Sequence, residues 1–179
     1  MTQQQLIEAL KQTLTKTKVN KLTALSLTDA YSIEDLLATC FHEETEIAFR
    51  AAWILEQVQQ VSPERFLPIL LHFTDAYPRQ QNHSCQRHFT KILMDLLKKR
   101  AFPPGFDYTP LIEATFEWLA HPEVPVAVKA NCMSVLFSLR RQDDWIEEEL
   151  RAQIEFLMRD GLPSIQSRGK KILSMLASN

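Results

Sequence analysis

A short apolar pattern that returns four times constrains this chain more than any other feature of its sequence. The pattern is Ile or Val, then Leu, two variable residues, and Val or Leu, and it begins at residues 54, 92, 135 and 172. The intervals are therefore 38, 43 and 37 residues. One such pentad occurs in many amphipathic helices, but four at comparable intervals indicate an internal repeat. The pattern predicts repeated helical units.

Apolar residues recur at helical spacing along nearly the whole chain, and the breaks fall at proline or at polar clusters. Residues 3–17 are predicted to form an amphipathic helix through Leu6, Leu10 and Leu14, followed by a basic, Thr-rich connection up to residue 27. Four helix pairs are predicted over residues 28–177: 31–41 with 45–60, 63–77 with 82–100, 108–120 with 124–141, and 143–160 with 163–177. We therefore expect one all-α domain over residues 1–179.

The few glycines and the positions of the prolines support a helical fold. Three Gly stand against nine Pro, whereas strand-rich and nucleotide-binding folds need Gly for positive φ angles and close backbone approach. Pro63, Pro110, Pro125 and Pro163 lie at or near predicted helix starts, where the missing backbone N–H costs little. Ser62 is predicted to be an N-cap.

A period near 40 residues with two helices per unit is the spacing of HEAT-type repeats. The chain resembles that family over roughly residues 28–177, through AFRAAWILEQV, CQRHFTKILMDLL, PVAVKANCMSVLFSL and QSRGKKILSML. In HEAT-like repeats a basic residue commonly precedes the apolar run of the second helix. Arg50, Arg87, Lys129 and Arg168 occupy that place here, at four, five, six and four positions before the pentad. The resemblance implies a right-handed α-α superhelix of about four helix pairs plus an N-terminal helix.

No catalytic, metal or cofactor site is predicted. HEAT-like deoxyhypusine hydroxylases hold two irons with several His-Glu dyads, but His42-Glu43 is the single uninterrupted dyad in this sequence. A metal site needs three or four converging ligands. Cys40, Cys85 and Cys132 are odd in number, widely spaced and set in apolar helical contexts, so we expect reduced core thiols in a cytoplasmic protein.

Charge is segregated along the chain although the net charge is −2. The second helices of the last three pairs carry eleven basic residues and one acid, Asp95, whereas the first helices at 108–120 and 143–160 are net acidic. The second helices usually line the concave surface of such solenoids, so a basic concave face is expected. Its candidate binding residues are Arg50, Arg87, Lys91, Lys98, Lys129, Arg140, Arg168 and Lys171. A structural role is the alternative, because cations also stabilise helix C-termini.

The sequence thus favours a non-catalytic repeat scaffold that binds a protein or peptide partner, expected to be acidic. The alternative is nucleic-acid binding, because the basic inner helices are similar to those of HEAT-like DNA alkylation repeat glycosylases. Their active-site Trp/Asp/Arg arrangement has no match, since Trp53, Trp118 and Trp145 lie far apart in the sequence. We expect no membrane segment, a cytoplasmic location, and a monomer or weak homo-oligomer.

Overall fold

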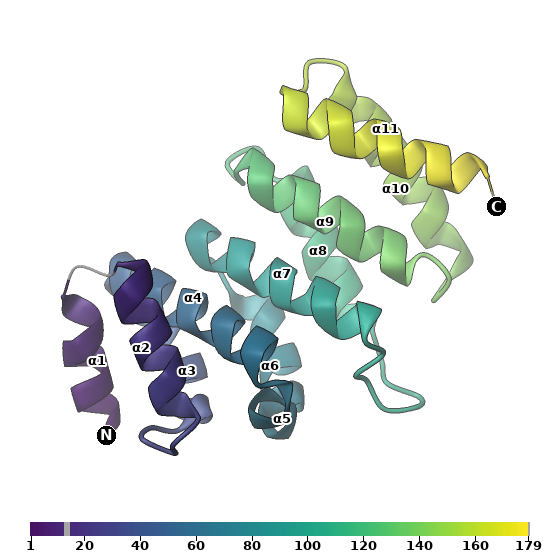
Figure 1. Ribbon diagram of the computed structural model, residues 1–179. Helices are drawn as coiled ribbons and strands as arrows, with labels where there is room; N and C mark the ends of the chain where they lie inside the picture. Colours follow the sequence, from purple (N-terminus) through teal and green to yellow (C-terminus); the bar gives the residue numbers. More distant parts are fainter. Residues whose placement is uncertain (13–14, 179) are drawn as a thin grey trace. The chain divides into compact units, whose positions relative to one another are not determined.

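The computed structural model describes residues 1–12 and 15–178, and every regular element in that part of the chain is helical (Figure 1). The all-α prediction is therefore confirmed. The α-helices are α1 (Gln3–Lys11), α2 (Lys16–Ser26), α3 (Ile33–Thr39), α4 (Thr45–Val61), α5 (Pro63–Phe66), α6 (Leu70–Ala76), α7 (His83–Lys98), α8 (Thr109–Ala120), α9 (Val126–Leu139), α10 (Asp144–Met158) and α11 (Pro163–Ala177). Two short 3₁₀ helices are η1 (Leu67–Ile69) and η2 (Tyr77–Arg79).

The chain divides into two compact units, Met1–Ile92 and Leu93–Asn179, so that α7 begins in the first and ends in the second. In the first unit α4 packs against α1, α2, α3 and α5. Ile47 and Ile54 lie on one side of α4 and Ala52 and Leu55 on another, and all four are buried because neighbouring helices cover both sides. An aromatic cluster of Phe66, Phe73, Tyr77 and Phe89 completes this core.

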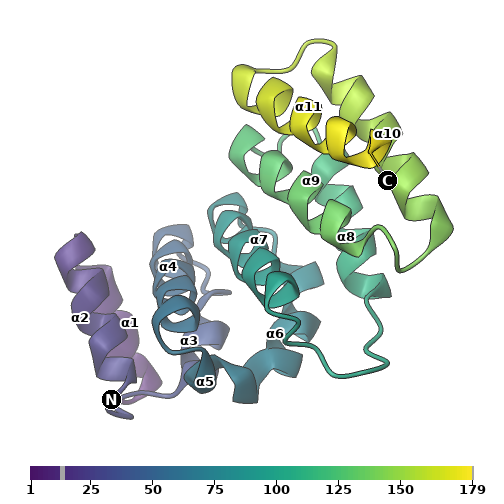
Figure 2. The ribbon, with the colours of Figure 1, turned by 45° about the vertical axis from the view of Figure 1, so that its right-hand side comes forward.

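In the second unit α9 is the helix with neighbours on several sides, and it packs against α8, α10 and α11 (Figure 2). Its residues Cys132, Met133, Val135 and Leu136 are fully buried. The approach of α10 to α11 is close at Gly169, where an added Cβ would lie 2.5 Å from the Met158 Sδ atom. The absent side chain of this glycine therefore makes room for α10.

The helix ends follow local sequence signals. Thr2 and Gln5 form a reciprocal capping box at the start of α1, and Thr15 and Ser32 each accept a hydrogen bond from the backbone of the next helix's first turn. The four prolines lie within the first two positions of their helices or at the N-cap. Ser62 occupies the N-cap of α5, but its hydroxyl donates to Glu64 instead of accepting a capping bond.

Two expectations about helices need correction. Residues 16–26, expected to form the end of the first helix and a connection, form the separate helix α2, which packs against α4 through a face that includes Val19, Leu22 and Thr23. Leu14, assigned to the first helix, lies outside the described residues. The predicted helix 63–77 is divided into α5, η1 and α6, because Pro68 has no N–H for a continuous helical ladder. The other predicted helices are present with ends shifted by a few residues.

Candidate binding surface

Arg50, predicted to contribute to a basic surface, is buried and tied to another helix. Its Nη1 donates to the carbonyl oxygens of Leu10 at 2.6 Å, Lys11 at 3.0 Å and Gln12 at 3.1 Å. Its Nη2 forms an ion pair with Glu46, one turn earlier on α4. The last carbonyls of a helix have no partner within the helix. Arg50 therefore caps the C-terminus of α1 from a neighbouring helix, and its guanidinium is directed into the protein.

Arg87 and Lys91 are exposed on α7, as the predicted surface requires. Lys91 nevertheless has a partner inside the protein: its Nζ forms an ion pair with the Glu56 Oε1 atom on α4. The Lys91 side chain is 42% exposed and that of Glu56 only 2%. Lys91 is thus accessible at the surface, but its ammonium group already neutralises a buried carboxylate.

Glu56 is held by two residues of α7. His88 Nδ1 lies 2.5 Å from Glu56 Oε2, opposite the contact with Lys91. Burial raises the pKa of Glu56, but the hydrogen bonds and charges of His88 and Lys91 outweigh it, so that the pKa lies below its ordinary value. Since an ionised carboxylate only accepts, His88 must carry a proton on Nδ1. The ring of His88 also packs against Phe49, with centroids 5.4 Å apart.

The sequence interpretation missed the Glu56–His88 contact. Glu56 falls within the apolar pentad that begins at Ile54, on a helix whose residues are apolar on nearly every side. A carboxylate buried in such a helix is costly unless it is paired. The presence of a carboxylate in an apolar helix could therefore have indicated that Glu56 has a cationic partner. It could not have shown that this partner lies on α7.

In the second unit, three of the predicted residues contact protein groups. Arg140 stacks on the Phe137 ring, 4.0 Å from its centroid, and donates to the Phe137 carbonyl oxygen at 2.8 Å. Arg168 of α11 donates to the Ser134 hydroxyl of α9. Both side chains are half-buried. Both side chains reach the surface and also contact residues of α9. Part of their hydrogen-bonding capacity is therefore already used within the protein.

Lys129 of α9 is only 8% exposed, and burial lowers the pKa of its ammonium group. Lys98 and Lys171, in contrast, are exposed in the last turn of α7 and the middle of α11. The predicted residues therefore fall into an accessible group, a half-buried group and a buried group. The accessible ones are Arg87, Lys91, Lys98 and Lys171; the half-buried ones are Arg140 and Arg168; the buried ones are Arg50 and Lys129.

The residues considered for other chemistry have ordinary contacts. His42 Nδ1 accepts a hydrogen bond from the Glu44 backbone N–H at 3.0 Å. Among the residues that the structure describes, no three His, Cys, Asp or Glu side chains converge as a metal site would need. Cys40, Cys85 and Cys132 are free and buried, as expected of core thiols.

The acidic run at the start of α10 is set at a helix N-terminus. Asp143 occupies the N-cap, and Asp144 and Glu147 follow in the first turn, where negative charge is favoured by the helix dipole. None of the described helices combines the length and the apolar character needed to cross a bilayer.

The packed helix pairs and the recurring pentads define an all-helical repeat protein. The sequence model described as the HEAT repeat domain matches residues 6–176, so the chain belongs to this family, and the resemblance seen in the sequence is confirmed. The match extends over α1 and α2, which the resemblance had not covered. No curated protein and no solved structure matches the chain.

Proposed function

We propose that this HEAT repeat protein is a non-catalytic scaffold that binds an acidic protein partner through accessible basic side chains of its second helices. Repeat families of this kind present extended binding surfaces, and HEAT repeats commonly mediate protein interactions. Lys98 and Lys171 are the accessible candidates in the second unit, and Arg87 and Lys91 are the accessible candidates in the first.

The distribution of charge between α10 and α11 is the observation that carries the proposal. α11 has Arg168, Lys170 and Lys171 and no acidic residue, whereas α10 has five acidic residues and one Arg. The two helices pack against each other in one unit. Charge separated in this way favours encounter with an acidic surface and disfavours a basic one.

The buried residues refine the proposal. Arg50 and Lys129 are omitted from this set of exposed basic residues, because both residues are buried. Lys91 is a poor site for charge reversal, because a glutamate there would face the buried Glu56. Lys98 and Lys171 are exposed, so their substitution tests binding with little effect on folding.

A random peptide library displayed on phage tests the proposal without a known partner. The library is selected on the wild-type protein, and the retained sequences are compared with the starting pool. We expect enrichment of Asp and Glu, and loss of the enriched peptides on the Lys98→Glu/Lys171→Glu variant. Enrichment of peptides without excess acidic residues, or equal retention by that variant, would contradict the proposal.

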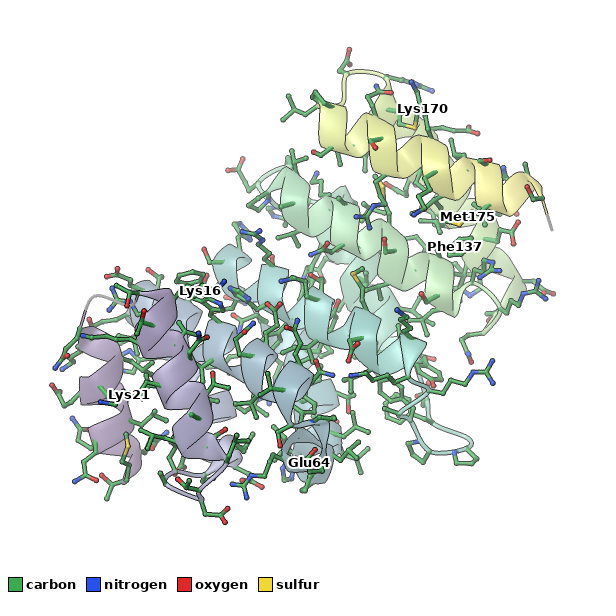
Figure 3. The ribbon with its side chains drawn as sticks, in the orientation of Figure 1. Lys16, Lys21, Glu64, Phe137, Lys170 and Met175 are labelled. Carbon is green, nitrogen blue, oxygen red and sulfur yellow. The ribbon has the colours of Figure 1, made fainter. Side chains whose placement is uncertain are left out.

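A matched variant controls for net charge. Lys16→Glu/Lys21→Glu makes the same change in charge on α2, where both lysines are exposed (Figure 3). It should retain the enriched peptides. The proposal includes a cytoplasmic location and a monomeric or weakly associating chain; the three free thiols support the former.

A further inference from the structure

A pocket with an apolar wall and one largely buried lysine lies at one end of the helices of the second unit. It has a volume of about 430 Å³ and is formed by the connection between α8 and α9 together with the turn between α10 and α11. Val124, Leu157, Leu162 and Ile165 supply apolar surface, and Lys129 lines the pocket from α9. Its size is within the range of ordinary ligand-binding pockets, roughly 300–1,000 Å³.

Lys129 has no ion-pair partner among the described residues. The residue is 8% exposed, so more than nine-tenths of its surface is covered. Asp160 lines the same pocket but forms no ion pair with it. Because most of the Lys129 side chain is removed from water, its charged form is less favoured, and its pKa is lowered chiefly by this burial. An anionic group that entered the pocket would supply the missing partner.

Large apolar side chains beside the pocket are exposed to solvent. Phe156 is 63% and Leu162 59% exposed, and both line the pocket. The Arg159 guanidinium lies over the Phe156 ring, 5.8 Å from its centroid. Arg159 and Asp160 are both exposed and oppose each other in charge, which leaves Lys129 as the cation that decides the charge preference. Beside the pocket, these exposed side chains offer apolar surface that the apolar groups of another molecule can cover.

We propose that this pocket binds a peptide segment of a partner protein in which one Asp or Glu is flanked by bulky apolar residues. The carboxylate accepts a hydrogen bond from the Lys129 ammonium, and the apolar residues cover Phe156 and Leu162. A peptide fits better than a small carboxylic acid, because the exposed apolar side chains extend the contact beyond the pocket. The inference rests on the proposed role as a protein-binding scaffold, but it concerns a site separate from Lys98 and Lys171.

The test uses fluorescein-labelled, end-capped peptides with a central Glu and flanking positions varied among Phe, Leu, Trp, Ser and Lys. Fluorescence anisotropy measures their affinity for the full chain. Peptides with Phe, Leu or Trp flanks should bind, and Lys129→Met should weaken them about tenfold or more, the usual effect of losing a charge-assisted hydrogen bond. Met retains the buried apolar stem. Lys170→Met, the same change on an exposed lysine of α11, should leave affinity within about twofold.

A double-mutant cycle separates direct contact from indirect loss. Replacing the central Glu of the peptide by Gln should weaken binding to wild type, but should have little further effect on Lys129→Met. Additive losses would overturn the contact. Leu162→Ser provides a second variant at an exposed position and should also weaken binding, even if Lys129→Met folded poorly.

Two further measurements distinguish this site from the basic surface and from a small-molecule pocket. Lys98→Glu/Lys171→Glu should leave the affinity of the pocket peptides within about twofold. Binding lost in that variant but not in Lys129→Met would contradict the pocket while supporting the proposed function. Octanoate, a small carboxylic acid with an apolar chain, represents a small-molecule ligand of the pocket. The proposal predicts that it displaces the peptides only at high concentration. Tight binding of octanoate without any peptide binding would overturn the proposal.

Discussion

Arg50 on α4 donates a hydrogen bond from Nη1 to the Leu10 carbonyl oxygen at 2.6 Å, and so closes the end of a helix that lies 40 residues earlier in the sequence. The same nitrogen reaches the carbonyl oxygens of Lys11 and Gln12. The basic residue that precedes the first pentad thus joins two helices of the first unit.

Replacing Arg50 by Met should lower the free energy of unfolding by roughly 2–3 kcal/mol, because the carbonyl groups at the end of α1 lose a charged donor inside the protein. Urea denaturation followed by circular dichroism measures the change. Arg141→Met removes an exposed arginine and should change stability by less than about 0.5 kcal/mol. Equal stability of the two variants would show that the Arg50 contacts contribute nothing to the fold.

Glu56→Gln should destabilise the protein at neutral pH by roughly 2 kcal/mol, since an amide cannot replace the carboxylate between His88 and Lys91. The pKa of Glu56 is lowered in the folded protein from the ordinary value of 4.5. Its ionised form therefore stabilises the fold above pH 4.5, and this contribution is lost as the pH falls through the lower, folded-state pKa.

The pH dependence isolates the carboxylate from the other acids. The stability difference between wild type and Glu56→Gln should be constant near neutral pH and shrink as the pH falls below 4.5. Urea unfolding at pH 7, 5, 4 and 3 measures it, with the exposed Glu148→Gln as the reference variant. A difference that stays the same down to pH 3 would exclude an ionised Glu56 as the stabilising group.

The three thiols should react slowly in the native protein. Burial raises the pKa of Cys85 to about 12 and holds the pKa values of Cys40 and Cys132 well above the ordinary value. Because the thiolate is the reactive form, a disulfide reagent such as Ellman's reagent should modify none of them promptly at pH 8. All three should react in urea. Rapid modification of one thiol in buffer would contradict its burial.

Gly169→Ala should destabilise the packing of α10 on α11, although Ala normally favours a helix over Gly by about 1 kcal/mol. The added Cβ would lie 2.5 Å from the Met158 Sδ atom and 3.0 Å from the Ile154 Cγ2 atom. In a Met158→Ala background the main obstruction is gone, so the same substitution should become stabilising. Thermal unfolding of the four proteins measures this change of sign, and its absence would indicate that Met158 simply moves aside.

The helix pairs could be predicted from the sequence because the pentads bury one side of each second helix, and this leaves a strong periodic signal. The helix α2 was missed because Thr23 and Ser26 occupy part of its buried face, which weakens the contrast between its sides. Within α5 to α6, the apolar spacing continued through Pro68 although the helix did not. Apolar periodicity shows which side of a helix is buried, but it does not show where the helix is interrupted.

The candidate surface could be predicted only in part, for a related reason. The repeat pattern indicates on which helix a basic residue lies. It does not indicate which group the side chain contacts, because that group comes from a distant part of the chain. Arg50 meets carbonyl groups of α1, and Lys91 meets Glu56, through contacts 40 and 35 residues apart in sequence. Lys129 lines a pocket together with residues of the turn between α10 and α11. Lys98 and Lys171 remain exposed.

The central claim is that accessible cations on the second helices bind an acidic protein partner, and a titration of one phage-selected acidic peptide tests it most directly. Fluorescence anisotropy is measured at 50 and 200 mM salt with wild type, Lys98→Glu/Lys171→Glu and Lys16→Glu/Lys21→Glu, and with a duplex DNA in parallel. We predict salt-sensitive peptide binding that falls about tenfold or more in the first variant and is retained in the second. Equal loss in both variants, or tighter binding of the DNA than of the peptide, would contradict the claim.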